Sequence, residues 1–552
     1  MISIKKKHFH LIINFCLISI LFSDGYAQNI DLKEIRKPVQ NGVEDIIKTY
    51  LHTINSGSRE KVLSFIHEHY DPAFLQQVPL HINLSIHMAN FYKTAGLGYE
   101  LHSVQLNDNN EYIASIYNNL TAAWLTLQIP ISPAPPHKIV MFPDIQPTTP
   151  PTNIEFQKRL NDQEIIRRLE LCLDSAVKDD EFSGAVLVAK NGIPLLKKAY
   201  GLASKSYNIR NRLDTKFNIA SLGKMFTGVA ITQLIQKGDL LLDDPLNKYV
   251  NDEWVKLEKS KMIQIQHLLT HTSGLGDYFK SLYTQLSPMV FRGLEDYQSL
   301  VVNQDLTFEP GERWAYSNTG MLLLGVVVEH ISGDSYYDYV RKHIFVPAGM
   351  IHSDYFEKDR PVSNRATGYI KELTDSGVRW QNNRFTRVMK GGPSGGSYST
   401  VEDLLNFDIA LRNHKLLDPK YTHMMLSAKP ELNSPFYGYG FFINESPVGR
   451  IASHGGDSSG ISCQYKMYLD IGYTTIILSN YNVPAAGLVE EVIHQMIVSH
   501  CVIATQKTEP GLGSTLNGLL PETVFKMRLP PPICRDKSGR IDTKNFLSED
   551  FK

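Results

Sequence analysis

The order of strand and helix patterns over residues 155–500 is the feature that most limits what this 552-residue chain can fold into. The stretch FSGAVLVAKNGIPLLKKAYG carries alternating apolar residues on either side of Asn191-Gly192, which is typical of a tight turn between antiparallel strands. A helix over 162–177 precedes this hairpin, and a long, mainly helical stretch follows it. Strands then return, ahead of a last helix over 486–499, at 437–443, 450–453, 462–469 and 474–479. This order predicts an α+β fold, in which helices flank an antiparallel sheet and an all-α lobe lies beside it.

The N-terminus carries a different pattern. Lys5-Lys6-Lys7 precedes an apolar run over 11–22, and small residues follow up to Ala27. This combination predicts a secretory signal peptide over 1–27, cleaved after Ala27, with an uncleaved anchor as the alternative. We therefore expect a periplasmic or secreted protein with no transmembrane segment after cleavage.

Three further segments surround the main domain. Residues 28–142 predict a small α+β accessory domain. Its expected helices cover 41–55, 59–68 and 80–93, and its expected strands cover 112–117, 123–129 and 138–142. A proline-rich linker is predicted over 143–154, and residues 501–552 form a tail with little apolar content for a core.

Composition excludes several classes of function. The formal net charge is −1, with 42% hydrophobic and 20% charged residues, so the chain is an ordinary globular protein without a basic footprint for nucleic acid. The cysteines and histidines show no metal-ligand spacing, and no cofactor is expected. Cleavage would leave Cys172, Cys463, Cys501 and Cys534, which we expect to be mostly free, with a Cys501–Cys534 bridge as the alternative.

A serine and a lysine stand three residues apart in FNIASLGKMFTGVAITQL. Apolar residues recur after Lys224 at nearly helical spacing, and Gly238 ends the pattern, so Ser221 lies at or near the first turn of a buried helix. Residues three apart on a helix are neighbours, so the Lys224 amine can reach the Ser221 hydroxyl and activate it as a nucleophile. Ser221 acting only as a helix cap is the alternative, but capping does not explain Lys224.

Two later segments supply groups that suit such a nucleophile. Tyr316-Ser317-Asn318 offers a phenol for proton transfer and an amide that can bind a carbonyl or hold Lys224. Ser453-His454-Gly455-Gly456-Asp457 follows one predicted strand and precedes the next at Ser462. We expect a strand edge there to give one backbone N–H to a carbonyl oxygen, with the Ser221 N–H as its partner.

These three elements, in this order, resemble the penicillin-recognising serine hydrolases, which include class C β-lactamases, D-alanyl-D-alanine carboxypeptidases and related esterases and D-aminopeptidases. The resemblance covers about residues 160–500 and implies a β-lactamase-like fold. QHLLTHTSGL, FEPGERWAYSN and GGPSGGSYST reinforce it. The stretch YLHTINSGSREKVLSFIHEHYDPAFL more loosely resembles nuclear-transport-factor-like domains, and that resemblance implies no activity.

The resemblance implies a role for each candidate residue. Ser221 would be the acylated nucleophile, with Lys224 and Tyr316 sharing proton transfer and Asn318 orienting the substrate. The backbone N–H groups of Ser221 and Asp457 would form the oxyanion hole, on the strand that carries His454, Gly455 and Gly456. The segment His271–Gly274 would be structural.

One position departs from the pattern of many β-lactamases. His454 stands where they have the lysine of a Lys-Thr-Gly triad, and a histidine is only partly charged near neutral pH. We therefore expect a secreted serine hydrolase acting on a D-amino-acid peptide or a small ester, with β-lactams as a further substrate class. A penicillin-binding or sensing protein without turnover is the alternative, and a functional unit over 30–142 is a third.

Overall fold

The computed structural model describes residues 40–78, 80–106, 112–132, 136–148, 160–279, 283, 285–374 and 377–508. The predicted signal peptide and most of the predicted tail lie outside these residues. Among the described helices, none is long and apolar enough to cross a membrane. Cys172 and Cys463 are free and buried, and Cys501 is free and half-buried, whereas Cys534 lies outside the described residues.

An antiparallel six-stranded sheet organises the main domain, in the order β13-β14-β15-β16-β5-β6. The hairpin of β5 and β6 therefore pairs, through β5, with β16 from the end of the domain, as the predicted α+β layout requires. Asn191 and Gly192 both have positive φ, of 51° and 76°, and make the predicted tight turn. The strands are β5 (Gly184–Lys190), β6 (Ile193–Tyr200), β13 (Phe442–Ser446), β14 (Gly449–Ser458), β15 (Ile461–Tyr468) and β16 (Tyr473–Ser479).

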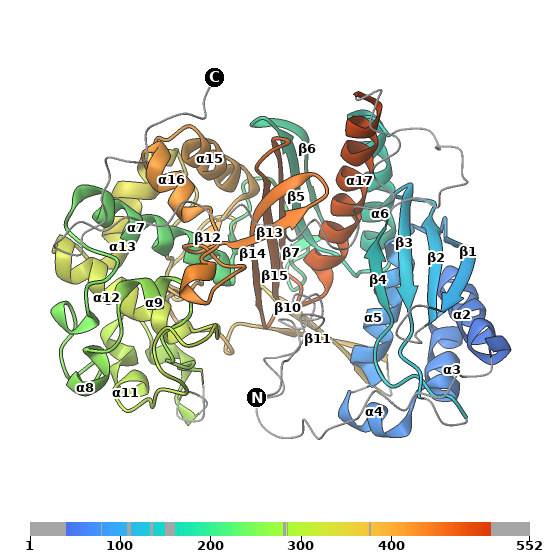
Figure 1. The fold of residues 1–552 in the computed structure, drawn as a ribbon, viewed down its shortest axis with the longest axis horizontal. Coiled ribbons are helices and arrows are strands. Elements are labelled where there is room, and N and C mark those ends of the chain that lie inside the picture. Colours follow the sequence, from blue (N-terminus) through green and yellow to red (C-terminus); the bar gives the residue numbers. More distant parts are fainter. Residues whose placement is uncertain are drawn as a thin grey trace. The chain divides into compact units, whose positions relative to one another are not determined.

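Both faces of this sheet are covered. Helices α6 (Asp162–Lys178) and α17 (Ala485–Thr508) lie along one face, and the helical lobe lies on the other side (Figure 1). Alternate residues therefore enter different cores: Leu187 packs with the lobe, and Val186 packs with α6 and α17. This double burial explains why β5 is apolar along nearly its whole length.

The lobe holds the helix that begins next to Ser221. It opens with a short 3₁₀ turn, η2 (Ala220–Leu222). The α-helices of this part of the chain, of which α15 packs against β5 and β16 of the sheet, are α7 (Gly223–Lys237), α8 (Leu257–Ser260), α9 (Ile265–Leu269), α11 (Gln298–Val301), α12 (Asn318–Ser332), α13 (Tyr336–Val340), α14 (Val346–Ala348), α15 (Val401–Arg412) and α16 (Pro419–Met425). Short two-stranded sheets join β7 (Leu202–Ser204) to β8 (Ile209–Arg210), β9 (Phe217–Asn218) to β12 (Tyr398–Ser399), and β10 (Tyr369–Thr374) to β11 (Gly377–Asn382).

The N-terminal region has the predicted helix-then-sheet order. Its helices are α2 (Gln40–Asn55), α3 (Arg59–His69), α4 (Pro72–Gln77) and α5 (Leu80–Tyr92). Its antiparallel sheet runs β1-β2-β3-β4, with β1 (Tyr99–Leu106), β2 (Tyr112–Asn118), β3 (Ala123–Gln128) and β4 (Asp144–Pro147). Its buried side chains share one apolar cluster with α6 and α17, and Asn118 and Thr121 donate hydrogen bonds to Gln495 of α17.

Several predicted segments need correction. Residues 138–142 form no strand, because Ile139 makes only isolated bridges while Val140 and Met141 are partly exposed. Strand β4 lies instead within the predicted linker, and β1 was not predicted. The last helix extends beyond residue 499 to Thr508, into the predicted tail.

Two strand predictions near the candidate site also need correction. The strand expected from residue 437 begins only at Phe442, since the chain turns at Gly438 and Gly440, whose positions leave no room for a side chain beside the backbone of Met425 and Lys224. The segment from Ser453 to Asp457 does not follow a strand but is the second half of β14 itself.

Candidate active site

Ser221 lies in η2, immediately before α7. Neither η2 nor α7 has a side-chain cap at its N-terminus, so helix capping does not account for this serine. Ala220 before it has a φ of +43°, in the left-handed region that non-glycine residues rarely adopt. The Asn218 side chain accepts a hydrogen bond from the Ala220 N–H (3.0 Å), and the Ala220 carbonyl accepts one from the Gly396 N–H (3.0 Å). These bonds hold a strained backbone at the serine, as is common at functional sites.

Lys224 is fully buried one helical turn away. Its Nζ donates to Ser221 Oγ (3.2 Å), to Asn318 Oδ1 (2.7 Å) and to the carbonyl of Ser394 (2.5 Å). Burial lowers the pKa of Lys224 to about 7, although the charge of Asp277 opposes that shift. The neutral form of Lys224, which can accept a proton from Ser221, is therefore accessible near physiological pH.

Asp277, an acidic residue that the sequence analysis did not single out, holds Asn318, the asparagine that binds Lys224. Asp277 Oδ2 accepts a hydrogen bond from Asn318 Nδ2 (2.5 Å), and the opposite end of the same amide faces Lys224. An amide between an ammonium and a carboxylate has one favourable orientation, since its oxygen must face the cation and its nitrogen the anion. Asp277 therefore holds Asn318 in place.

Tyr316 lies on the other side of Lys224. The Lys224 Nζ lies 4.8 Å from the centre of the Tyr316 ring. His271 packs against that ring with a centroid distance of 4.5 Å, and its Nδ1 accepts the N–H of Ser317 (3.1 Å). The buried His271 therefore positions the Tyr316-Ser317-Asn318 segment, in agreement with the structural role that the resemblance implies for it.

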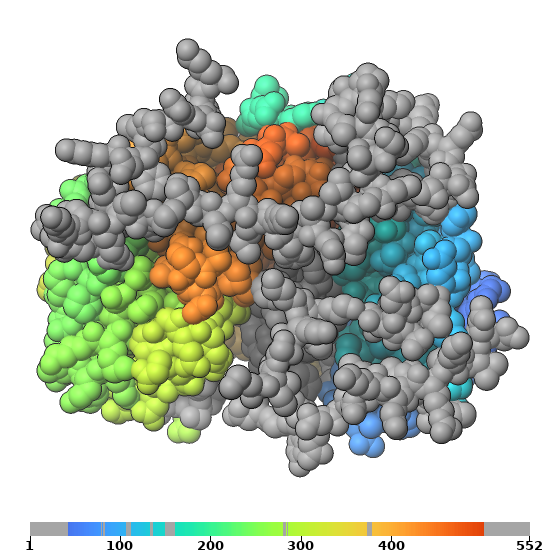
Figure 2. All heavy atoms as spheres, in the orientation of Figure 1, coloured from blue at the N-terminus to red at the C-terminus, as the bar shows by residue number. Residues whose placement is uncertain are grey.

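Aromatic side chains enclose this part of the site. Trp314 packs against Phe436 at a centroid distance of 4.7 Å, and Asn433 donates to the carbonyl of Gly311 (2.8 Å). Segments more than a hundred residues apart in the sequence therefore meet here. On the face drawn in Figure 2, the yellow-green segment near residue 310 and the orange segment near residue 435 lie side by side.

His454 points from β14 toward the same region, at 6.5 Å between its ring centre and that of Tyr316. Its Nδ1 donates to the carbonyl of Gly455 (2.6 Å), so Nε2 is the acceptor and faces the Tyr437 hydroxyl (3.3 Å). Burial, helped by the charge of Lys224, lowers the pKa of His454 to about 3. At neutral pH this side chain is therefore uncharged, which differs from the partly charged group that the sequence predicts.

Strand β14 passes close to the serine. A side chain at Gly456 would lie 2.3 Å from the carbonyl of Ile219, so only glycine allows this approach. Strand β13 pairs with β14 only as far as Ser453, which leaves the half from His454 to Asp457 without that neighbour. The expected strand edge is thus present, although β14 as a whole lies inside the sheet.

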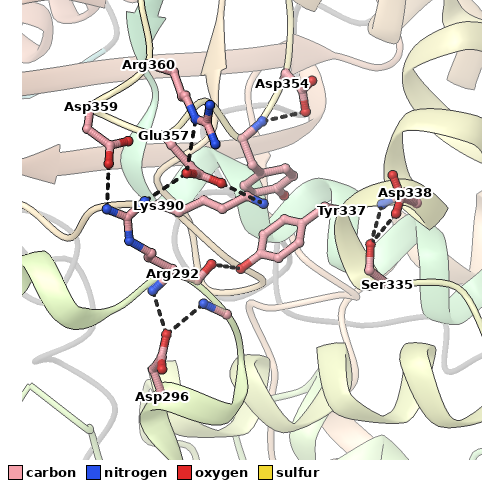
Figure 3. A network of polar contacts seen from close by, with 12 residues as sticks. Arg292, Asp296, Ser335, Tyr337, Asp338, Asp354, Glu357, Asp359, Arg360 and Lys390 are labelled. Carbon is pink, nitrogen blue, oxygen red and sulfur yellow. Dashed lines mark hydrogen bonds and ion pairs between the residues drawn. The ribbon is translucent and has the colours of Figure 1, made fainter.

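A glycine-rich loop completes the surroundings of the serine. A side chain at Gly395 would lie 2.3 Å from the carbonyl of Ala220, and the neighbouring Ser394 supplies the carbonyl that Lys224 binds. Lys390, which precedes the loop, lies over the Tyr337 ring (3.7 Å) and near Glu357, as Figure 3 shows. This loop is the GGPSGGSYST segment of the sequence, but its backbone contact with Lys224 could not be predicted from the sequence.

The structure thus gathers Ser221, Lys224, Tyr316, Asn318 and His454 at one place, beside the strand that carries Gly455, Gly456 and Asp457. It adds Asp277 and the Ser394 carbonyl, which sequence reasoning missed. In the described part of the chain, no group of three or more acidic, histidine or cysteine side chains could hold a metal ion. The arrangement is suited to nucleophilic catalysis by a serine with a neighbouring amine as base.

Comparison with known proteins agrees with this class of site. The Beta-lactamase family matches residues 170–495, more than half of the chain. The chain therefore belongs to the β-lactamase family, within the superfamily of β-lactamase and penicillin-binding-protein-like serine hydrolases.

Individual relatives support the same assignment. The chain is similar to Penicillin-binding protein 4* of Bacillus subtilis (strain 168), with 30% identity over 327 residues that cover 57% of this chain and 71% of that protein. It is 28% identical over 283 residues to the putative penicillin-binding protein PbpX of the same organism, covering 51% of this chain and 67% of that protein. A crystal structure of a penicillin-binding protein from Bacillus halodurans is 33% identical, with a TM-score of 0.53, and covers 58% of this chain and 98% of that one.

Proposed function

We propose that the protein is a secreted serine hydrolase that forms an acyl-enzyme on Ser221 and cleaves an amide or ester bond. The observation that carries this proposal is the buried Lys224, which is bonded to the Ser221 hydroxyl and has its pKa lowered to about 7. An amine whose pKa lies near neutral pH is matched to the removal of a proton from an alcohol.

The reaction follows from these positions. Neutral Lys224 takes the proton of Ser221, and Oγ attacks the substrate carbonyl. The backbone N–H groups of Ser221 and Asp457 stabilise the negative oxygen of the tetrahedral intermediate. Lys224 or Tyr316 then delivers a proton to the leaving group. Water hydrolyses the acyl-enzyme, with the same two residues available as base.

The charges in the site favour certain substrates. His454 is neutral, and Lys224 already has three hydrogen-bond partners, so neither offers a permanent cation for a substrate carboxylate. This favours small esters, and D-amino-acid peptides whose binding does not depend on a free C-terminal carboxylate, over the carboxylate-bearing β-lactams, which remain a further class to test.

A substrate panel tests the proposal directly. D-Ala-D-Ala peptides, short-chain p-nitrophenyl esters and a chromogenic cephalosporin are given to the mature wild type and to Ser221→Ala. We expect turnover of a peptide or an ester that Ser221→Ala reduces by at least about a thousandfold, and a mass increase on Ser221 that equals the acyl group. Turnover that survives in Ser221→Ala would overturn the assignment of the nucleophile.

A second candidate function is supported by the names of the relatives, since those at 30% and 33% identity are penicillin-binding proteins. In that case Ser221 is acylated by a penicillin and the acyl-enzyme persists. A fluorescent penicillin distinguishes the two functions, because stable labelling without release of product supports a binding or sensing role.

We also propose that the protein is exported to the periplasm or the medium. The basis is the predicted signal peptide over 1–27. Expression of the full chain and N-terminal sequencing of the exported product should give a first residue of Gln28. Retention of Met1 in the membrane fraction would instead support the uncleaved anchor.

A further inference from the structure

A small cavity lies at the end of the six-stranded sheet, where β14 turns into β15. It is lined by Gly460 at that turn, by Asn218 of β9 and Tyr398 of β12, and by Asn383, Lys358 and Arg387. Its free space admits a group of about the size of a water molecule. Two of its lining side chains are cationic and none is acidic.

The residues that the structure describes provide no anionic partner for the cations at this cavity. The Lys358 ammonium donates to backbone carbonyls, among them that of Arg387 (2.9 Å). The guanidinium of Arg365 beside it donates to the carbonyls of Glu357 and Lys358, both at 2.9 Å. Arg387 donates through Nη1 to the Ser458 hydroxyl, and its Nε is buried without a hydrogen-bond partner. Among the described residues, no ion pair includes any of these three cations.

Two neighbouring carboxylates, those of Glu357 and Asp359, already have cationic partners. Glu357 contacts Arg292 (2.9 Å), Arg360 (3.8 Å) and Lys390 (3.9 Å), as Figure 3 shows. Asp359 pairs with the other end of the Arg292 guanidinium at 2.5 Å. These acids therefore cannot neutralise the cations at the cavity.

Charged side chains without a counter-ion at this cavity destabilise the folded protein. Like charges near one another disfavour ionisation, and a buried guanidinium N–H without an acceptor loses the hydrogen bond that it has in water. In agreement, burial together with the charges of Arg387 and Arg365 lowers the pKa of Lys358 to about 8. A bound negative charge would remove both costs, since it would accept from Arg387 Nε and separate the cations.

We propose that this cavity binds a compact monovalent anion, of the chloride or carboxylate type, between Lys358 and Arg387. The site adjoins the catalytic region through two contacts. Arg387 holds Ser458, one residue beyond Asp457 on β14, and the lining residue Asn218 holds the strained Ala220 before Ser221. The anion would therefore stabilise the two segments whose N–H groups form the proposed oxyanion hole.

Anion titration of the mature protein tests the site without any need for activity. The melting temperature is measured as sodium chloride replaces sodium gluconate at constant ionic strength, because gluconate is too large for the cavity. We expect a saturable rise for the wild type. The charge-matched control Arg384→Gln removes an exposed cation of the same loop and should respond as the wild type does.

Arg387→Gln should need at least a tenfold higher chloride concentration for half of the rise, and its stability relative to the wild type should improve as chloride is withdrawn. Arg387→Lys keeps the charge and should retain most of the response, which guards against misinterpreting a folding defect. An equal response of wild type, Arg387→Gln and Arg384→Gln would overturn the site, and so would no response in any of them.

A second measurement distinguishes the two sources of the anion. Formate and acetate replace chloride in the titration, and chloride is then tested as an inhibitor of a substrate with a free carboxylate and of its methyl ester. If the cavity receives the substrate carboxylate, chloride raises KM for the acid only. If the anion is a resident ion, chloride changes KM of both substrates equally or not at all. The titration stands even if the proposed hydrolase activity is not found.

Discussion

Two buried polar clusters in this chain look alike by composition and differ in what they can do. In the N-terminal region, His87 binds the Tyr70 hydroxyl through Nε2 (2.8 Å), while its Nδ1 and both amide atoms of Asn83 are buried without partners among the described residues. At the candidate active site, Lys224 is just as buried but has three partners, one of them the Ser221 hydroxyl.

The difference lies in where the polar groups converge. The N-terminal cluster holds no nucleophile, and burial lowers the pKa of His87 to about 3, so its imidazole stays neutral at physiological pH. At Lys224, burial lowers the pKa of the amine to about 7 against the opposing charge of Asp277, beside the Ser221 hydroxyl. Both regions therefore bury polar groups, but only the candidate active site places an amine with a pKa near neutral pH beside a nucleophilic hydroxyl.

Removal of the Lys224 amine should have the largest effect, because it takes away the group that distinguishes the candidate active site from the N-terminal cluster. We expect Lys224→Met to lower kcat/KM at least a thousandfold, because the serine then loses its base. Lys224→Arg is the control that keeps a cation but cannot deprotonate. Substantial activity in Lys224→Arg would contradict the role of base.

The pH dependence of kcat/KM should report the ionisation of Lys224. Lys224 acts when it is neutral, so log kcat/KM should rise by about one unit per pH unit below a pKa near 7 and level off above it. Initial rates with an uncharged ester from pH 5 to 9 measure this limb. A limb near pH 10 would contradict the lowered pKa.

Loss of the carboxylate that holds Asn318 should have a smaller effect. Asp277→Asn leaves the amide without an anion to orient it, and we expect about a tenfold loss in kcat/KM. Because Asp277 favours protonated Lys224, the acid limb should also move to lower pH in the variant. A loss of activity without that movement would indicate a purely structural role.

The smallest effect should come from the N-terminal cluster. Asn83→Leu replaces a buried amide without partners by an apolar group of similar size, so the free energy of unfolding should stay the same or rise by about 1 kcal/mol. Hydrolase activity should be unchanged. Denaturant unfolding and the ester assay test both points, and a loss of more than about 1 kcal/mol would show that Asn83 has a partner of its own, such as an ordered water.

Much of the fold could be predicted from local patterns. The turn at Asn191-Gly192, the start of α7 just after Ser221 and the strands β15 and β16 follow from residue type and period. Predictions failed where a pattern depends on a distant neighbour. The run around Val140 is strand-like in composition but finds no continuous partner, and β4 forms from a proline-rich stretch because β3 offers it an edge.

By itself, the sequence determined the family and the residues that could carry the chemistry. A serine, a lysine, a tyrosine and an asparagine at these spacings indicate a serine nucleophile with its base, whatever their distances in the folded chain. Only the tertiary structure decided their states. Burial near Lys224 lowers the pKa of His454, and burial lowers the pKa of Lys224 despite the opposing charge of Asp277. These quantities depend on which atoms come within a few ångströms after folding, and segments such as 277, 318 and 394 meet there although they are far apart in the chain.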